Sequence, residues 1–282
     1  MTVPSPPYPI PVRWRPSALV RASLGLHAGA LALVLARPSA WPWAVGAVLA
    51  DHAVLTATGL TPRSGLLGPN WTRLPEGAVR RRELALTLDD GPDPRITPRV
   101  LDLLEERGVK ATFFCIGERV QRHAELAREI VHRGHSVENH SQRHLNYFSL
   151  LGPRGLVAEI ERAQDTIGIA TGQQPLFFRA PAGLRSPFLD PVLSRIGLRL
   201  ASWTRRGFDT VNRSAETVLG KLTRDLGAGD ILLLHDGHAA LTGNGVPVIL
   251  EVLPRLLDAL AATALTPVTL RAALAASSQP SP

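Results

Sequence analysis

Cysteine, methionine and tyrosine are scarce in this sequence of 282 residues. The chain has one cysteine, one methionine and two tyrosines. A single cysteine excludes an internal disulfide framework and a structural zinc site closed by several cysteines. Cys115, in the apolar run Phe113–Ile116, is expected to be a buried strand residue. Any metal site in this chain is therefore expected to use histidines and carboxylates.

Acidic residues are outnumbered by basic ones, and aromatic residues are few. Lysine and arginine number 31 against 24 aspartates and glutamates, which gives a formal net charge of +7, and aromatic residues make up 5% of the chain. Such a charge attracts nucleic acid, anionic lipid or an acidic substrate. Because the arginines are dispersed and few aromatic side chains accompany them, we expect no nucleic-acid partner.

The longest apolar runs lie near the N-terminus, after a proline-rich segment, residues 1–16, that is expected to be a flexible leader. Ser17–Ala36 and Trp41–Leu60 are of about membrane-spanning length, and we expect a helical hairpin over residues 17–60. Ionisable residues inside such spans are costly and usually paired, and a turn near Ser39 would bring His27 opposite Asp51.

Three interpretations of the hairpin stay open: insertion into a membrane, docking on the rest of the chain, and a cleaved signal peptide. We favour insertion, because the leader is long and no small-x-small cleavage site follows the first stretch. Arg13 and Arg15 precede the first stretch, Arg37 alone lies between the two, and Arg80 to Arg82 follow the second. The positive-inside tendency then places the C-terminal domain on the cytoplasmic side of a bacterial-type inner membrane, with the extracytoplasmic side as the alternative.

Residues 61–82 are expected to be a linker along the membrane surface. From residue 83, short apolar segments alternate with amphipathic ones, which is the pattern of repeated βα units. Strands are expected at Leu84–Leu88, Ala111–Ile116, Ser136–Glu138, Leu176–Phe178, Arg199–Trp203, Asp230–Leu234 and Pro267–Leu270. Helices are expected at Thr97–Arg107, Val120–Arg133, Gly155–Thr171, Pro187–Ile196, Ala215–Leu226 and Pro247–Ala262.

The predicted fold class is α/β: a distorted, incomplete (β/α) barrel of about seven strands over residues 83–272, preceded by the α-helical hairpin and followed by a disordered tail at 273–282. The candidate metal-binding and catalytic residues follow the ends of predicted strands, where α/β barrels have their active sites.

Metal-binding side chains follow two of the predicted strands. Asp89 and Asp90 come directly after the first strand, and His140 and His144 come after the third. Two histidines four residues apart on a helical turn have Cβ atoms roughly 5–6 Å apart, so both rings can reach one ion. One carboxylate adds a third ligand, and three ligands with an open position are typical of catalytic zinc sites. The sequence therefore predicts one divalent metal ion, with zinc as the first expectation.

Five short motifs make residues 83–270 resemble the polysaccharide deacetylases of the NodB homology type, carbohydrate esterase family 4. The first is Thr87-Leu-Asp-Asp-Gly-Pro92, in which the resemblance implies that Asp89 is the catalytic base and Asp90 a metal ligand. The second is His140-Ser-Gln-Arg-His144, whose two histidines complete the metal set. The resemblance also implies a metal-activated water as the nucleophile.

Arg179-Ala-Pro-Ala-Gly183 resembles the third motif, whose arginine orients the base. Arg179 would then position Asp89, and its planar guanidinium can hold a carboxylate by two hydrogen bonds. Pro181 and Ala182 would border the substrate, and the Ala182 backbone N–H would stabilise the oxyanion. Such a donor is worth about 3–4 kcal/mol in the transition state. Many family members have tyrosine at the position of Ala182, so this change concerns the substrate groove.

Leu232-Leu-Leu-His235 resembles the fifth motif. The resemblance implies that Leu233 lines the pocket for the acyl methyl and that His235 protonates the leaving amine as general acid. Asp209 matches the acid of the fourth motif that tunes this histidine. The adjacent Asp236 and His238 receive no predicted role.

The fourth motif departs from the family at two positions. Arg206 stands where the family has an acid, and Thr210 stands where it has a tryptophan. Arg206, next to Arg205, indicates either an anionic group on the substrate or a solvated basic turn. Trp203, just upstream, is predicted either to stack on a sugar or to fill the core.

The residues and the resemblance together predict a hydrolase acting on carbon–nitrogen bonds other than peptide bonds. It would remove an N-acetyl or other N-acyl group from an amino-sugar residue of a lipid-linked or cell-envelope glycan. The partners expected are that glycan or lipid-linked sugar and membrane lipid. Alternatives are a deformylase of a lipid-linked amino sugar, an O-acetyl glycan esterase, and, in another class, a catalytically silent glycan-binding or scaffold protein. An acid–base pair favours the enzyme, since a binding protein needs none.

Overall fold

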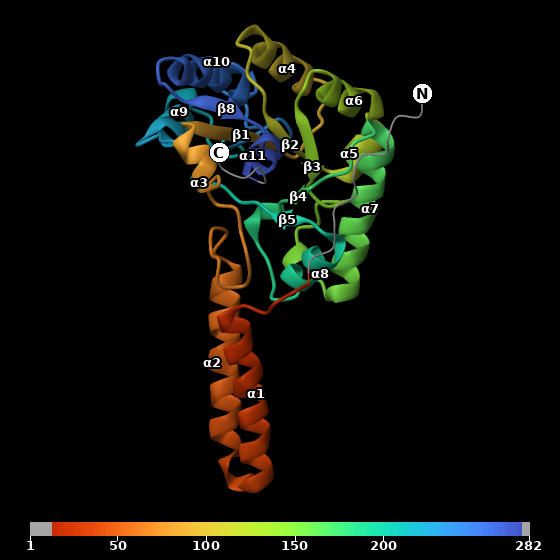
Figure 1. The fold of residues 1–282 in the computed structure, drawn as a ribbon, viewed down its shortest axis with the longest axis vertical. Helices are drawn as coiled ribbons and strands as arrows, with labels where there is room; N and C mark the ends of the chain where they lie inside the picture. Colours follow the sequence, from red (N-terminus) through yellow and green to blue (C-terminus); the bar gives the residue numbers. More distant parts are fainter. Residues whose placement is uncertain (1–12, 278–282) are drawn as a thin grey trace.

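A parallel β-sheet wrapped by helices forms the main body of the protein in the computed structural model, which describes residues 13–277 (Figure 1). The strands are β1 (Glu83–Asp89), β2 (Thr112–Cys115), β3 (Ser136–Asn139), β4 (Phe177–Phe178), β5 (Arg199–Leu200), β6 (Arg205–Arg206), β7 (Ile231–His235) and β8 (Thr266–Val268). Their order is β5-β4-β3-β2-β1-β7-β6, and β8 pairs with the start of β1. Every pairing is parallel, and β5 and β6 are edge strands, so the sheet is an incomplete (β/α) barrel as predicted.

Helices connect the strands and cover the outside of the sheet. They are α4 (Thr97–Glu106), α5 (Gly117–Arg122), α6 (Ala124–His132), α7 (Pro153–Thr171), α8 (Leu189–Ile196), α9 (Ala215–Thr223) and α10 (Val248–Ala261). Two short helices, α3 (Glu76–Arg80) and α11 (Leu270–Ser277), lie at the N-terminal end of β1. Single turns of 3-10 helix occur at Pro38–Ala40, Phe148–Leu150 and Pro181–Gly183.

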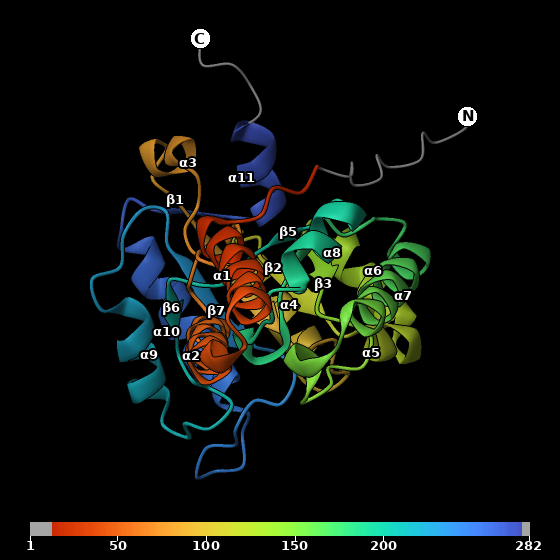
Figure 2. The same cartoon turned by 90° about the horizontal axis from the view of Figure 1, so that it is seen from below.

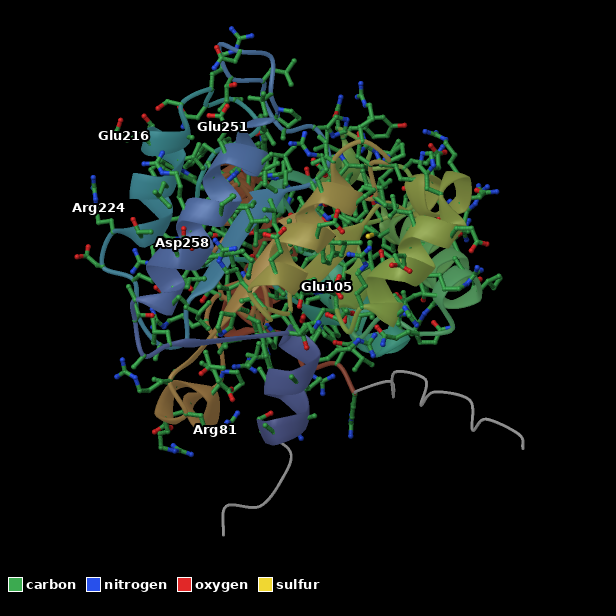
Figure 3. The ribbon with its side chains drawn as sticks, turned by 90° about the horizontal axis from the view of Figure 1, so that it is seen from above. Arg81, Glu105, Glu216, Arg224, Glu251 and Asp258 are labelled. Atoms are coloured by element: carbon green, nitrogen blue, oxygen red, sulfur yellow. The ribbon has the colours of Figure 1, made fainter. Side chains whose placement is uncertain are left out.

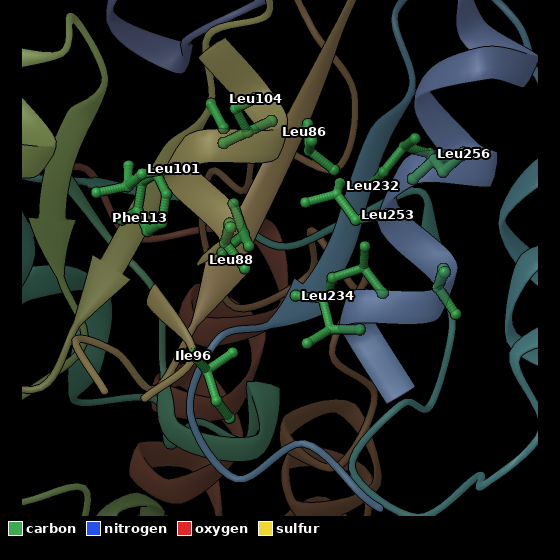
Figure 4. Packing of buried hydrophobic residues seen from close by; sticks show 14 of the residues in the cluster. Leu86, Leu88, Ile96, Leu101, Leu104, Phe113, Leu232, Leu234, Leu253 and Leu256 are labelled. Carbon is green, nitrogen blue, oxygen red and sulfur yellow. The ribbon is translucent and has the colours of Figure 1, made fainter. Parts of the chain in front are cut away.

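Alternation along the strands separates an outer core from the barrel interior. Leu84, Leu86 and Leu88 of β1 pack outward against the helices, in a cluster with Leu232 and Leu234 of β7 (Figure 4). Intervening strand residues point inward because successive side chains in a strand point to opposite faces. The interior is therefore lined by Ala85, Thr87, Asp89, Phe114, Ile231 and Leu233.

The helices around the sheet are amphipathic, with apolar side chains toward the strands and charged side chains toward the surface. Leu253 and Leu256 of α10 are buried against the sheet (Figure 4), whereas Asp258 on the same helix and Glu216 on α9 are exposed among the charged side chains of the surface (Figure 3). A helix with an apolar stripe on one face buries that face against a neighbouring layer.

The hairpin stands away from this body as two antiparallel helices, α1 (Ala18–Ala36) and α2 (Trp41–Gly59) (Figures 1 and 2). Each has 19 residues and is about 28 Å long at 1.5 Å per residue. Within residues 13–277, α1 has the length and composition of a membrane span, whereas α2, which was also expected to span, does not. As predicted, His27 lies opposite Asp51, with 3.7 Å between His27 Nδ1 and Asp51 Oδ2, and Ser23 donates to the same carboxylate at 2.7 Å.

Residues 61–82, predicted to be a linker, pack along the open edge of the barrel between the two edge strands. The Trp71 N–H donates to the Leu200 carbonyl in β5, and the Leu74 N–H donates to the Gly229 carbonyl before β7, at 2.9 and 2.8 Å. Thr204 Oγ1, between β5 and β6, donates to the Thr72 carbonyl at 2.6 Å. These edge groups satisfy their hydrogen bonds with the linker because they have no neighbouring strand.

Several element boundaries differ from those predicted. The two-residue strand β6 was not expected, Val120–Arg133 divides into α5 and α6 at His123, and residues 199–203 contribute only the two residues of β5 to the sheet. Residues 273–277, predicted to be disordered, belong to α11, which buries Ala273 against the barrel interior. The leader residues 1–12 and the tail residues 278–282 lie outside the described residues.

His135, in the turn before β3, makes the stability of the fold depend on pH. Its side chain is buried, and Nδ1 accepts the Ala111 N–H at 3.1 Å. Burial, together with the charges of Lys110 and Arg133, lowers its pKa to about 4. The unfolded chain, with a histidine pKa near 6.5, binds this proton more tightly. The stability that depends on neutral His135 is therefore complete above about pH 6.5 and is lost as the pH falls toward 4.

Between pH 7 and pH 5 the free energy of unfolding should fall by about 2 kcal/mol less in His135→Gln than in the wild type. The reason is that glutamine can accept the same N–H but does not titrate. Urea denaturation of the full chain in nonionic detergent measures this difference. His132→Gln, at a side chain that is 83% exposed, is the matched control and should follow the wild type. An identical pH dependence in His135→Gln would contradict the assignment.

Candidate active site

Asp90, His140 and His144 come together at the carboxyl ends of β1 and β3. Asp90 Oδ1 lies 3.3 Å from His140 Nε2 and 3.3 Å from His144 Nε2. All three offer ligand atoms that lie within 4.8 Å of one another. The sequence-predicted metal set is thus assembled, with Asp90 and His140 buried and His144 partly exposed.

The chemistry of this cluster fits a divalent cation. Asp90 Oδ1 is buried and accepts no hydrogen bond within the described residues. His140 Nδ1 donates to the Arg179 carbonyl at 2.8 Å, which leaves the Nε2 lone pair directed at Asp90. Burial opposes a charge on His140, but Asp89 and Asp90 outweigh it and raise its pKa. Burial lowers the pKa of His144 to about 4, which keeps this ring neutral. The site therefore favours a positive charge and offers one anionic ligand, the Asp90 carboxylate, and neutral imidazole ligands for a cation.

Arg179 is fully enclosed and holds Asp89. Its side chain is 1% exposed, and Nη1 donates to Asp89 Oδ1 at 2.6 Å and to Thr87 Oγ1 at 2.8 Å. The remaining nitrogens donate to the carbonyls of Ala201 and Ser202 at 3.2 and 2.7 Å. The expected pair of hydrogen bonds to the carboxylate is therefore replaced by one. Asp89 Oδ2 is left toward the metal cluster, 3.9 Å from His140 Nε2.

Asp209 and His235 form a second buried pair on the opposite side of the pocket. Asp209 accepts the His235 backbone N–H at 2.7 Å and the ring Nδ1–H at 2.8 Å, so the carboxylate fixes both the ring and its tautomer. Burial disfavours a charged imidazole, but the Asp209 carboxylate outweighs this and raises the pKa of His235. Nε2 of His235 is then the nitrogen that faces the pocket.

One pocket of about 220 Å³ joins these groups. Asp89, the three metal-set residues and His235 line it, and so do Ala182, Leu233, Trp203, Arg206 and Thr210. Pro181 was predicted to contact substrate, but it is buried and is not among the lining residues. Ala182 is exposed with a φ of 54°, so its backbone is presented at the pocket. Trp203 is a core residue that also lines the pocket, so its predicted core role is confirmed and sugar stacking stays a prediction.

Two functional contacts were missed in the sequence. His238 lines the pocket, with Nδ1 3.3 Å from Asp90 Oδ2, although no role was assigned to it. The Thr87 hydroxyl accepts a hydrogen bond from Arg179 Nη1 and donates one to the Leu232 carbonyl at 2.7 Å. The position of His238, three residues after His235 in a loop that follows a strand, was the available signal.

Backbone strain is concentrated at this site. Eight non-glycine residues in the described part of the chain have a positive φ, and six of them lie in the loops around the pocket: Asp90, Ser141, His144, Ala182, Phe208 and His238. Such conformations cost roughly 1–3 kcal/mol each and persist where the surrounding structure enforces them. Gly183 is required for a related reason: its φ is 75°, and a Cβ there would collide with Trp203 and Pro62.

The base of the hairpin lies against the same loops. The Arg185 N–H donates to the Gly59 carbonyl at 3.1 Å, which joins the end of α2 to the segment after Ala182. Three residues further along the chain, the Pro62 carbonyl accepts a hydrogen bond from Ser202 Oγ at 2.7 Å. The hairpin therefore leaves the body of the protein at the catalytic end of the barrel.

Residues 76–201 match the family model described as polysaccharide deacetylase. A peptidoglycan-N-acetylglucosamine deacetylase of Bacillus cereus is 35% identical over 175 residues, which cover 61% of this chain and 81% of that protein. A chitooligosaccharide deacetylase of Bradyrhizobium sp. is 34% identical over 174 residues, which cover 58% and 79%.

Similarity extends to solved structures. The crystal structure of a peptidoglycan N-acetylglucosamine deacetylase in complex with a substituted benzamide superposes with a TM-score of 0.65 at 25% identity, covering 72% of this chain and 91% of that one. The sequence matches, the shared barrel and the assembled site agree, and the chain belongs to the polysaccharide deacetylase family of hydrolases.

Proposed function

We propose that this protein is a metal-dependent deacylase that removes an N-acetyl group from an amino-sugar residue of a glycan presented at a membrane surface, with a lipid-linked sugar as the first expectation. The observation that carries the proposal is the convergence of Asp89, the Asp90–His140–His144 set and His235 on one pocket. The relatives that act on N-acetylglucosamine in peptidoglycan and on chitooligosaccharides support the acetyl group and the amino sugar.

Each catalytic group has a role that its surroundings favour. A divalent ion, with zinc as the first expectation, would be held by Asp90, His140 and His144, where it would polarise the acyl carbonyl and lower the pKa of a water molecule. Asp89, oriented by Arg179, would take the proton of the attacking water on Oδ2. His235 would give a proton from Nε2 to the leaving nitrogen, and the Ala182 N–H would donate to the oxyanion.

The position of the hairpin supports a membrane-bound substrate. Leu60 at the end of α2, Leu150 and Phe188 line one groove beside the hairpin base, and they are 59%, 84% and 51% exposed. Along the hairpin itself, Leu35, Trp43 and Leu49 are 74%, 81% and 63% exposed. Exposed apolar surface of this extent marks a contact with lipid or with another apolar partner. A hairpin buried in lipid would hold the catalytic pocket close to the membrane surface.

Asp89→Asn should lower kcat for acetate release by about 10²–10⁴-fold while the bound metal is retained, because asparagine keeps the shape of the base but takes up no proton. Acetate release from N-acetylated chitooligosaccharides and metal content by mass spectrometry give the two readouts. Asp225→Asn, at an exposed residue outside the pocket, is the control. A variant with wild-type turnover would refute the role of Asp89.

Asp90→Ala should lose both bound metal and acetate release, since it removes the anionic ligand, whose Oδ1 lies 3.3 Å from Nε2 of both His140 and His144. The metal-to-protein ratio after dialysis separates this variant from Asp89→Asn, in which metal should remain. His132→Ala controls for loss of an exposed histidine. Metal retention at the wild-type ratio would count against this ligand set.

The full chain should stay in the membrane fraction through washes with high salt and should be released by nonionic detergent. Apolar side chains in lipid are indifferent to ionic strength, whereas a basic surface bound to anionic lipid is released by salt. Immunodetection of the protein in the two fractions is the measurement. Release by salt alone would exclude insertion of the hairpin.

A further inference from the structure

A second cavity, of about 620 Å³, adjoins the catalytic pocket and shares Trp203 and Arg206 with it. Five of its nine lining residues are basic and none is acidic; the basic ones are Arg63, Arg205, Arg206, Lys221 and Arg224. Arg63 comes from the segment that follows the hairpin, Arg206 from β6, and the last two from α9 and its C-terminal cap. We call this the basic cavity.

Four of the five cations have no anionic partner. Arg205 is neutralised by Asp230, with 2.6 Å between Nε and Oδ2, and its guanidinium also donates to the carbonyls of Arg224 and Asp225. Across residues 13–277, no carboxylate forms an ion pair with the other four basic residues of the cavity. Arg63 Nη1 donates only to the Thr204 carbonyl, at 3.0 Å. The cavity therefore concentrates positive charge that the protein itself does not balance.

Two of the cations, Arg206 and Lys221, lie over aromatic side chains that line the basic cavity. The Arg206 guanidinium lies 5.4 Å from the Trp203 ring centroid and 4.9 Å from that of Phe208, and Lys221 Nζ lies 4.8 Å from the Phe208 centroid. Cation–π contacts hold the charges in place but leave their donors available. Nε of Arg206 is buried and has no hydrogen-bond partner within the described residues. Like charges held this closely repel each other, and a bound anion removes the repulsion.

We propose that the basic cavity binds a phosphate group of the substrate while the acylated amino sugar occupies the catalytic pocket. Phosphate carries up to two charges and several acceptor oxygens, which suits a group of arginines and a lysine better than a single carboxylate does. The inference rests on the proposed function for the position of the sugar. The shared chemistry is a sugar phosphate, and its source is either a lipid-linked sugar or a water-soluble phosphate-bearing glycan.

Binding of glucosamine 1-phosphate and of glucosamine, measured by calorimetry on the metal-loaded full chain in nonionic detergent, tests the cavity without any turnover. We expect the phosphate to tighten binding at least about tenfold in the wild type. Lys221→Ala/Arg224→Ala should abolish most of this difference, because these residues line the basic cavity and not the catalytic pocket. Arg99→Ala/Arg162→Ala, which removes two exposed charges from α4 and α7, is the matched control and should keep the full difference.

Equal affinity for the two sugars in the wild type would overturn the proposal, and so would an undiminished difference in Lys221→Ala/Arg224→Ala. An intact difference without acetate release from any acylated sugar would refute the proposed function and leave the phosphate site standing. Acetate release without the difference would refute the phosphate site alone.

The source of the phosphate follows from kcat/KM for acetate release from N-acetylglucosamine 1-phosphate and from N-acetylglucosamine linked to a prenyl phosphate in detergent. Values at least about tenfold higher for the prenyl-linked sugar, reduced in Lys221→Ala/Arg224→Ala, identify a lipid-linked substrate. Equal values for the two, both reduced in that variant, identify a water-soluble glycan. Values for both sugars that match the wild type in that variant would contradict a phosphate contact in this cavity.

Discussion

The buried ion pair between Arg179 and Asp89 is the interaction on which the interior of the barrel depends. A guanidinium that is 1% exposed costs several kcal/mol of desolvation unless its donors are all used. Here the Asp89 carboxylate, the Thr87 hydroxyl and two backbone carbonyls accept from it, and the Phe114 ring lies 4.0 Å from its central carbon. The contact that compensates the buried cation also leaves Asp89 Oδ2 toward the pocket. Stability of the interior and orientation of the proposed base therefore rest on the same atoms.

Elements with a continuous apolar pattern could be predicted from the sequence, and elements held by distant partners could not. β2 and β7 are buried throughout and β1 is buried from Leu84 onward, so their apolar runs mark them. β6 consists of Arg205 and Arg206, and only its hydrogen bonds to β7 make it a strand. The short helices α3 and α11 were not predicted. Helices of this length are stabilised by tertiary packing, here at the end of the barrel, and the sequence alone does not show that packing. The filling of the barrel gap by Trp71 to Leu74 depends on which strands are left at the edges.

At the site, most of the candidate residues could be identified from residue type and spacing along the chain, whereas the contacts between them are visible only in the structure. The spacing of His140 and His144 led to a metal set that the structure brings together. The expected helical turn was wrong, because residues 140–144 form a loop in which Ser141 and His144 have a positive φ. The pairing of Asp209 with His235 joins residues 26 positions apart and was supplied by family resemblance. His238 was missed because its approach to Asp90 depends on the left-handed turn at His238 itself, with a φ of 60°. Pro181 was predicted to contact substrate, but it is buried in the turn that precedes Ala182 and does not line the pocket.

The departures from the family pattern lie in the lining of the catalytic pocket, and the base of the hairpin is joined to the segment after one of them, Ala182. Asp89, Asp90 and His235 keep the family's residue types, whereas Ala182, Arg206 and Thr210 differ, and of these Arg206 also lines the basic cavity. Pro62, just after the hairpin, lines the basic cavity together with Trp203 and Arg206, and its carbonyl accepts a hydrogen bond from Ser202 Oγ. The base of the N-terminal hairpin therefore lies beside the wall that bears Arg206, so the proposed phosphate contact and the proposed membrane anchor share one structural support.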